Sequence, residues 1–215
     1  MLASVYYQAC VITMKALMLG LTWWRVEGKE KVPRQGPLLV VANHLNIIDP
    51  PLLSASVPRR IMFLAKKELF NPRTPGSLFV RAFGAFPVRR GELDRRALKW
   101  SLQVLRDGGA LGMFPEGTRS PNAQLTPAFP GSALIALRSG APILPVAISG
   151  SEKVNSLVNI LRRPRVKVTI GEPFSLPRVE GRVSKAELAR AAEFIMRQIA
   201  QLLPPSYRGV YGNSG

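Results

Sequence analysis

Short apolar runs, each closed by a polar or glycine-containing turn, recur along this 215-residue chain. Runs of this kind lack helical periodicity, and several are rich in β-branched residues, which is typical of buried strands. Segments between some of these runs have helical spacing instead, and a glycine lies beyond their ends. Strands that alternate with helices predict a single α/β domain. The expected strands are residues 38–41, 61–65, 110–114, 143–148 and 166–170.

Three further helices are expected later in the domain, in addition to one that begins near Asp49. Residues 93–106 and 132–138 have helical spacing, and glycines follow both segments. The last helix should begin at the capping box formed by Ser184 and Glu187 and should end before Pro204. Its apolar residues recur at helical spacing, so we expect it to pack on the core and not to bind a partner. Residues 206–215 are expected to be a flexible tail.

The only histidine of the chain, His44, follows the strand expected at 38–41 and precedes Asp49 and a pair of prolines. Prolines suit the first turn of a helix, with Asp49 at its N-cap. The imidazole is therefore expected on a strand-to-helix turn, with the carboxylate at the mouth of the helix. A pair placed in this way can act as an oriented general base near neutral pH. A lone histidine is as often a surface or core residue, and these residues alone leave that alternative open.

A second segment, Phe114-Pro115-Glu116-Gly117-Thr118-Arg119-Ser120, also follows an apolar run. Alone, it is equally consistent with a strand, a turn and a surface Glu–Arg pair. With the first segment it forms part of four blocks that resemble the glycerolipid acyltransferase family, most closely its bacterial 1-acylglycerol-3-phosphate acyltransferases. The first and third blocks are Asn43-His44-x4-Asp49 and residues 114–120. The second and fourth are Gly84 to Arg90 and an apolar run around Pro145.

The resemblance implies a central mixed sheet flanked by helices, with an N-terminal membrane-associated helical segment. It also implies transfer of a fatty acyl chain to the sn-2 hydroxyl of 1-acylglycerol 3-phosphate (lysophosphatidic acid), which gives phosphatidic acid. The donor would be a thioester of acyl-carrier protein or coenzyme A, and no cofactor or metal is expected. His44, oriented by Asp49, would be the general base. No covalent acyl-enzyme is required, because the thioester is already activated and no Gly-x-Ser-x-Gly elbow is present.

The resemblance further assigns substrate and phosphate binding to Glu116, Gly117, Thr118 and Arg119. An arginine can fork onto phosphate oxygens, whereas Glu116 is expected to hold Arg119 or a glycerol hydroxyl. Amides near Gly117 are candidates for stabilising the oxyanion. Further phosphate candidates and supporting residues are Arg89, Arg90, Asn43, Pro115 and Pro145. The chain departs from the family at Arg89, where many members have Asp, and at residues 128–131, where many have a lysine.

The charge of the chain indicates an anionic partner. Thirty Lys and Arg residues against 13 Asp and Glu give a formal net charge of +17. Nucleic acid, an anionic bilayer or a phosphorylated substrate would each satisfy it. A hydrophobic content of 47% and the absence of zinc-finger, basic-zipper or RNA-binding motifs argue against nucleic acid. The nearer alternative to the expected activity is the same chemistry on another acceptor, such as a lysophospholipid, an ornithine-type lipid or glycerol 3-phosphate. A non-enzymatic basic protein that binds membrane or nucleic acid is the distant alternative. One cysteine and one histidine make a structural metal site improbable.

The N-terminal segment is the first candidate membrane surface. Residues 2–24 carry a single charge, Lys15, which falls on one narrow helical stripe with Ser4, Gln8 and Thr22. Such a helix can span a bilayer, lie in its interface or pack its polar side on the protein, and an ordinary buried helix is the remaining alternative. Trp23 and Trp24 resemble an interfacial anchor. The predicted organisation is a membrane-associated segment at 1–27, a catalytic domain at 28–205 and the tail.

A second candidate membrane surface is residues 59–106, which carry twelve basic and three acidic residues, interleaved with phenylalanines. Such a mixture fits an anionic bilayer, although a solvated charged face over core phenylalanines is the alternative. Together these features predict a peripheral or monotopic protein on the cytoplasmic face of the bacterial inner membrane. Anionic membrane lipids are the expected partners, and the oligomeric state stays open.

Overall fold

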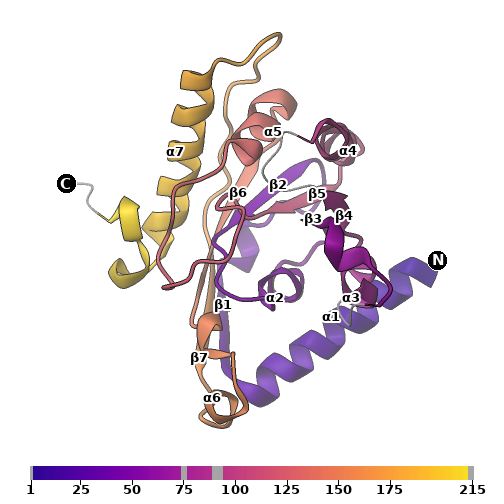
Figure 1. Ribbon diagram of the computed structural model, residues 1–215, viewed down its shortest axis with the longest axis vertical. Coiled ribbons are helices and arrows are strands. Elements are labelled where there is room, and N and C mark those ends of the chain that lie inside the picture. The colour runs from indigo at the N-terminus through magenta and orange to yellow at the C-terminus, as the bar shows by residue number, and fades with distance from the viewer. Residues whose placement is uncertain (1, 74–76, 89–93, 213–215) are drawn as a thin grey trace.

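The computed structural model describes residues 2–73, 77–88 and 94–212 and shows a central sheet with helices on both faces (Figure 1). Its seven strands lie in the order β1-β7-β6-β2-β5-β3-β4. All neighbouring pairs are parallel except β6 and β7, so the expected mixed α/β sheet is confirmed. The strands are β1 Trp23–Glu27, β2 Leu38–Ala42, β3 Ile61–Lys66, β4 Phe86–Val88, β5 Ala110–Met113, β6 Ile143–Ser149 and β7 Arg165–Ile170.

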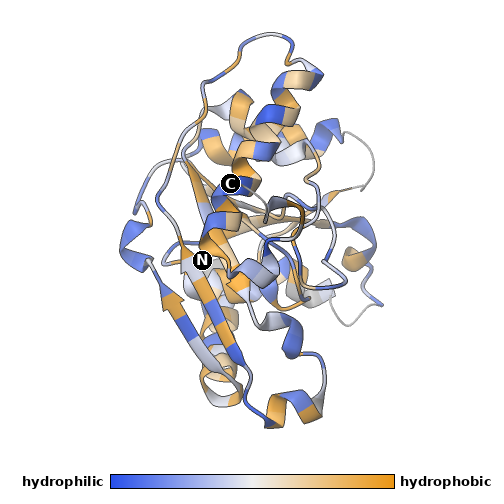
Figure 2. Ribbon diagram, turned by 90° about the vertical axis from the view of Figure 1, so that its left-hand side faces the viewer, coloured by the Kyte–Doolittle hydropathy of each residue, from blue (hydrophilic) through white to orange (hydrophobic). Residues whose placement is uncertain are grey.

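The helices pack against the two faces of this sheet. They are α1 Leu2–Leu21, α2 Asp49–Ser56, α3 Ser77–Ala82, α4 Arg95–Arg106, α5 Gly131–Ser139, α6 Leu157–Leu161 and α7 Lys185–Leu202. Leu39 and Val41 of β2 pack in one core cluster with α4, α5 and α7. Leu38 and Val40 pack in a second cluster with α1 and α2. Because both faces are covered, every residue of β2 is buried, and the strands form an apolar centre (Figure 2).

The N-terminal helix ends at Leu21, earlier than expected. Trp23–Glu27 forms the edge strand β1, which pairs in parallel with β7. The segment 1–27, which was predicted to be separate from the catalytic domain, therefore includes one strand of the sheet. Trp24 packs partly against the core instead of anchoring a helix end. Sequence reasoning missed this strand because its pairing partner lies far along the chain, and nothing in the apolar run itself marks the change from helix to strand.

One face of α1 packs on the domain, and the opposite face is exposed. The packed residues are Tyr7, Val11, Met14 and Met18. Of the polar stripe, Gln8 and Lys15 are exposed, whereas Thr22, just beyond the helix, is buried. Among the described residues, no helix combines the length and apolar character that crossing a membrane requires. The exposed apolar residues of α1 are Val5, Tyr6, Ile12, Leu17, Leu19 and Leu21.

The C-terminal segment packs against the domain over its described residues, whereas residues 206–215 were predicted to be a flexible tail. Two 3-10 turns, Pro205–Tyr207 and Gly209–Tyr211, follow α7. Tyr211 is buried, and the backbone carbonyl of Tyr207 accepts a 2.9 Å hydrogen bond from Leu125 N. The predicted capping box of α7 is present at Ser184 and Glu187. The tail packs because its tyrosines supply buried area and hydrogen-bond partners.

Within residues 59–106, the structure places several side chains in the interior. Phe63 and Phe83 are buried core residues, as the alternative to a membrane surface required. Arg59 donates hydrogen bonds to the backbone carbonyls of Pro33, Gly36 and Gly108, at 2.7–3.1 Å. This arginine therefore joins three loops and is not a free surface cation.

Candidate active site

The site lies at the edge of the sheet where the parallel strands β2, β5, β3, β4 and β6 end. In an α/β sheet, ligands bind outside the carboxyl ends of the strands, because the connecting loops meet there. The loop after β2 carries His44, and the loop after β5 carries Glu116. The register places Val41 beside Met113 of β5 and Pro145 of β6. Three chain segments distant in sequence therefore converge at this edge.

His44 and Asp49 form a buried pair. The Nδ1 atom of His44 lies 2.9 Å from Oδ2 of Asp49, and the same oxygen accepts 2.6 Å bonds from the amides of Leu45 and Asn46. Asp49 was predicted at the N-cap of α2, but it is the first residue of the helix, and the N-cap is Ile48. With a carboxylate as its acceptor, Nδ1 carries the proton and Nε2 is left with its lone pair. That is the tautomer a general base requires.

The ring and backbone of His44 are held by the loop that follows β5. The imidazole stacks on Phe114, with ring centroids 4.2 Å apart and planes inclined by 23°. The amide of His44 donates to Oε1 of Glu116 at 3.0 Å, and its carbonyl accepts from Ser120 N at 2.8 Å. The third sequence block therefore orients the first one. Sequence reasoning found both blocks but not these contacts, for which the sequence carries no local signal.

Glu116 is buried, and protein donors occupy both of its carboxylate oxygens. Oε2 accepts 2.9 Å hydrogen bonds from the amide and the hydroxyl of Thr126, while Oε1 accepts from His44. Burial raises the pKa of Glu116, and these hydrogen bonds partly oppose that shift. These contacts position two loops, and the described residues show no hydrogen bond or ion pair between Glu116 and Arg119. The contact with a glycerol hydroxyl stays a prediction.

The rest of the third block forms a tight turn that presents Thr118 and Arg119 to solvent. Gly117 adopts a φ of +65°, and a Cβ atom there would lie 2.7 Å from a ring carbon of Phe129. Its amide donates to the carbonyl of Phe114 at 2.9 Å, so this amide serves the turn and not an oxyanion. Glycine is required here both for its backbone conformation and for the close ring.

The supporting residues fix the backbone around the site. Asn43 donates to the carbonyl of Ile148 at 2.8 Å and accepts from its amide at 2.7 Å. This pair of bonds extends the junction between the loop after β2 and strand β6. Asn46, which sequence reasoning missed, donates to the carbonyls of Ser151 and Val154 at 2.8 and 3.1 Å. Its place between His44 and Asp49 was the only available signal.

The two prolines have structural positions. Pro115 is buried, and its carbonyl accepts a 2.8 Å hydrogen bond from the amide of Phe129. Pro145 lies in the sheet opposite Val41, and its carbonyl accepts from Gly171 N at 2.9 Å. Both therefore shape the loops and strands beneath the site. Arg89 and Arg90 lie outside the described residues.

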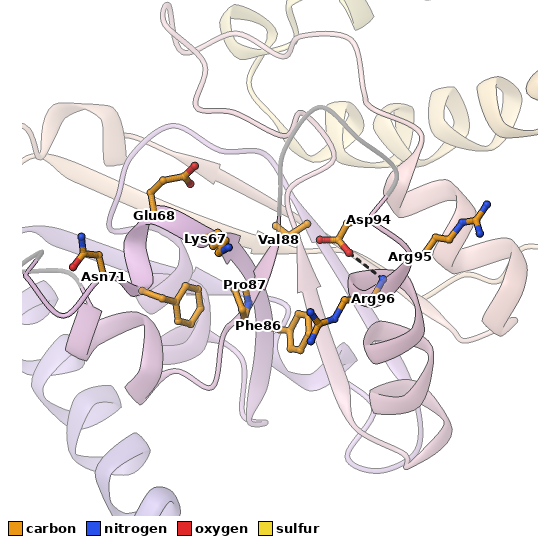
Figure 3. A pocket seen from close by; sticks show the side chains of 10 residues that line it. Lys67, Glu68, Asn71, Phe86, Pro87, Val88, Asp94, Arg95 and Arg96 are labelled. Carbon is orange, nitrogen blue, oxygen red and sulfur yellow. Dashed lines mark hydrogen bonds between the residues drawn. The ribbon is translucent and has the colours of Figure 1, made fainter.

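A pocket of about 990 Å³ opens at the carboxyl ends of β3 and β4 (Figure 3). It lies two strands away from β2, at the same edge of the sheet as His44. Its rim has the cations Lys67, Arg95 and Arg96, and Phe70 and Phe86 supply apolar wall. Among the described residues, no group of three or more His, Cys, Asp or Glu side chains is placed to hold a metal ion. The remaining lining residues are Glu68, Asn71, Pro87, Val88 and Asp94.

Comparison with known proteins gives consistent results at the level of the family. Residues 24–149 match a family model described as "Acyltransferase". The chain is 29% identical over 197 residues to the 1-acyl-sn-glycerol-3-phosphate acyltransferase of Bacillus subtilis. The match covers 91% of this chain and 96% of that protein. A protein of the same name from Streptococcus pneumoniae is 33% identical, and the chain spans 58% of its length.

Two further matches concern the acceptor and the fold. The lyso-ornithine lipid O-acyltransferase of Pseudomonas aeruginosa is 34% identical over 192 residues, covering 80% of this chain and 70% of that protein. The crystal structure of the 1-acyl-sn-glycerophosphate (LPA) acyltransferase PlsC of Thermotoga maritima superposes with a TM-score of 0.70. It is 29% identical, and the match covers 91% of this chain and 78% of that one.

Proposed function

We propose that this chain, which belongs to the acyltransferase family, transfers a fatty acyl group from an acyl thioester to the sn-2 hydroxyl of 1-acylglycerol 3-phosphate. The product is phosphatidic acid. The observation that carries the proposal is the buried contact between His44 Nδ1 and Asp49 Oδ2, at the edge of an acyltransferase fold. The names of the relatives from Bacillus subtilis and Streptococcus pneumoniae support this choice of acceptor.

In the proposed reaction, Nε2 of His44 removes the proton of the sn-2 hydroxyl as its oxygen attacks the thioester carbonyl. The new C–O ester bond forms, the C–S bond breaks, and the imidazolium returns the proton to the leaving thiolate. Asp49 stabilises the transient imidazolium, because its carboxylate is already directed at Nδ1 by two backbone amides. No metal or organic cofactor takes part.

Cations near the site support an acidic acceptor. We place its phosphate at Arg119, which is exposed on the turn next to Gly117, with Arg89 and Arg90 as further ligands. A forked guanidinium suits phosphate oxygens better than an ammonium does. The neighbouring pocket is lined by three cations, two carboxylates and two phenylalanines, so it fits a molecule that carries both charged groups and an apolar part. Either coenzyme A or acyl-carrier protein, both anionic, would serve as the carrier of the donor acyl group.

The exposed apolar face of α1 and the net charge of +17 support binding to an anionic bilayer. We place the protein peripherally on the cytoplasmic face of the bacterial inner membrane. An interfacial position suits the chemistry, because a lysolipid acceptor and a lipid product both reside in the bilayer.

A lyso-ornithine lipid is the second candidate acceptor, because the Pseudomonas aeruginosa relative is 34% identical over 80% of this chain. The chemistry at His44 would be the same, and only the headgroup contacts would differ. The extent of the match to the Bacillus subtilis protein, 96% of its length, and the abundant cations favour the phosphate-bearing acceptor.

The test measures thiol release by purified full-length protein from acyl-coenzyme A and acyl-carrier protein. Each donor is paired with lysophosphatidate or with lyso-ornithine lipid, and the product is identified by mass. Phosphatidic acid formed by wild-type protein and not by His44→Ala is the expected result. A product from lyso-ornithine lipid alone would replace the acceptor. No thiol release with either acceptor would favour the non-enzymatic alternative.

A further inference from the structure

Helix α6 and the end of α1 form an exposed apolar surface at one end of the molecule. Figure 1 shows α6 beyond the end of β7, close to the C-terminal end of α1. Val158 and Leu161 of α6 are 61% and 83% exposed, and Leu19 and Trp23 are each 61% exposed. Large apolar side chains grouped in this way on a surface indicate an interaction site. We call these four residues the α6 surface.

Specific contacts hold the α6 surface together. The guanidinium of Arg163 lies over the ring of Trp23, 4.5 Å from its centroid, and donates a 3.1 Å hydrogen bond to the carbonyl of Leu19. Trp23 N donates to the carbonyl of Pro164 at 3.0 Å. Arg163 also adopts a left-handed backbone with φ of 46°, which is uncommon for a residue with a side chain. The loop between α6 and β7 is therefore held in one position against the end of α1.

The chain segment that carries α6 is basic, and one of its cations, Lys167, is paired with Glu27 of β1. Residues 153–171 contain five basic residues and no Asp or Glu. Arg162, Arg163 and Arg165 are exposed beside the apolar side chains. This arrangement fits the interface of an anionic bilayer, because the apolar side chains can insert below the headgroups while the cations stay at the level of the lipid phosphates.

The α6 surface also lies at the edge of the sheet that carries His44. The connection to α6 leaves the carboxyl end of β6, and β1 and β7 begin at this edge, with Trp23 opposite Arg165. Asn46, between His44 and Asp49, binds the carbonyls of Ser151 and Val154 at the start of this connection. A bilayer bound by the α6 surface therefore faces the edge where the acceptor must enter.

We propose that the α6 surface is a membrane-docking site for bilayers that contain anionic phospholipid, separate from the exposed face in the middle of α1. The proposal rests on the proposed function only in that a lipid acceptor gives the docking a purpose. Docking through two sites would fix the rotation of the protein on the membrane, because one helix alone allows the domain to roll about its axis.

The test uses full-length protein and vesicles of phosphatidylcholine with or without phosphatidylglycerol. The variant Val158→Gln/Leu161→Gln should partition onto the anionic vesicles roughly tenfold less than wild type, since two inserted side chains lose their apolar burial. Val210→Gln is the matched control, because Val210 is 66% exposed on the C-terminal segment. Val158→Ile/Leu161→Met should retain wild-type partition. Val158, Leu161 and Val210 are all exposed to solvent, so the melting temperatures of these variants should agree with that of wild type.

Three results would overturn the proposal. The first is that Val158→Gln/Leu161→Gln partitions onto vesicles as wild type does, and the second is that Val210→Gln loses as much partition as this double variant. The third is that the double variant converts a dimer in solution to a monomer, because that result would assign the surface to a second copy of the chain. Arg162→Gln/Arg165→Gln should lose the preference for anionic vesicles, and a retained preference would also count against it. Thiol release with a short-chain soluble acceptor should be unchanged in every variant. Vesicle partition needs no catalysis, so absence of thiol release in wild type would refute the proposed function separately.

Discussion

The backbone amide of His44 donates a hydrogen bond to Glu116, 72 residues further along the chain. Glu116 also accepts both donors of Thr126, so one buried carboxylate joins the loop after β2, the loop after β5 and the segment beyond it. The candidate base and the turn proposed to bind phosphate are therefore parts of one hydrogen-bonded unit. A change at Glu116 should reach His44 without any change in the histidine itself.

Glu116→Gln should lower the free energy of unfolding by about 1–3 kcal/mol. The new NH2 group would face the N–H or O–H donors of His44 or Thr126, which need an acceptor. Turnover should fall while the KM for both substrates changes little, since protein donors already occupy both carboxylate oxygens of Glu116. Urea denaturation and steady-state kinetics measure the two effects. Full stability together with a raised KM for the acceptor would instead restore Glu116 as a substrate ligand.

The same residue predicts a dependence of stability on pH. Burial raises the pKa of Glu116 in the folded state above its unfolded value of 4.5. Folded protein therefore holds this proton at pH values where unfolded protein has released it, so its contribution falls as pH rises from 4.5 through the folded pKa. The difference in unfolding free energy between wild type and Glu116→Gln should shrink over that interval. A difference that grows there would contradict the assignment.

The pair formed by His44 and Asp49 predicts separable effects on chemistry and folding. His44→Ala should retain less than a few per cent of turnover, because the chain has no other histidine. Asp49→Asn should lower turnover by roughly two orders of magnitude or more, through loss of the charge facing the imidazolium. Oδ1 of Asp49 is buried and unpartnered among the described residues, so an amide nitrogen there displaces no hydrogen bond. Near-normal turnover in either variant would remove the general-base assignment.

Arg119 tests the placement of the acceptor phosphate. Arg119→Ala should raise the KM for lysophosphatidate roughly ten- to a hundredfold, since a forked charge-assisted contact is lost. The KM for the thioester should stay close to its wild-type value. Arg119→Lys should recover only part of the loss, because an ammonium does not reproduce the fork. An increase in the thioester KM alone would reverse the orientation of the two substrates.

The sequence predicted what depends on neighbouring residues. His44 and Asp49 are five positions apart, so strand and helix signals were enough to place them at one turn. The capping box of α7 and most strand positions were predicted for the same reason. The role of Glu116 was missed, because it depends on contacts with residues 72 positions away. The edge strand Trp23–Glu27 and the packed C-terminal turns also depend on distant partners.

The two faces of α1 predict opposite consequences for matched substitutions. Ile12 is 64% exposed, so Ile12→Gln should weaken vesicle binding and leave the melting temperature unchanged. Met14 belongs to the core cluster beneath β2, so Met14→Ala should lower the free energy of unfolding by about 2–3 kcal/mol.

Wild-type protein should remain on vesicles at high salt, because salt does not screen apolar contact. Complete release by salt would show that binding is electrostatic alone.

Tyr207 joins the C-terminal turns to the loop beside the active site, since its hydroxyl donates a 2.7 Å hydrogen bond to Glu152. Burial, and then Glu152, raise the pKa of Tyr207 from 10.0 to about 12. Between these values folded protein keeps a proton that unfolded protein has lost, so this contribution to stability falls as pH rises through that window. Tyr207→Phe should lose about 1 kcal/mol at neutral pH and show a shallower alkaline decline by urea denaturation. An equally steep decline in the variant would place the titrating group elsewhere.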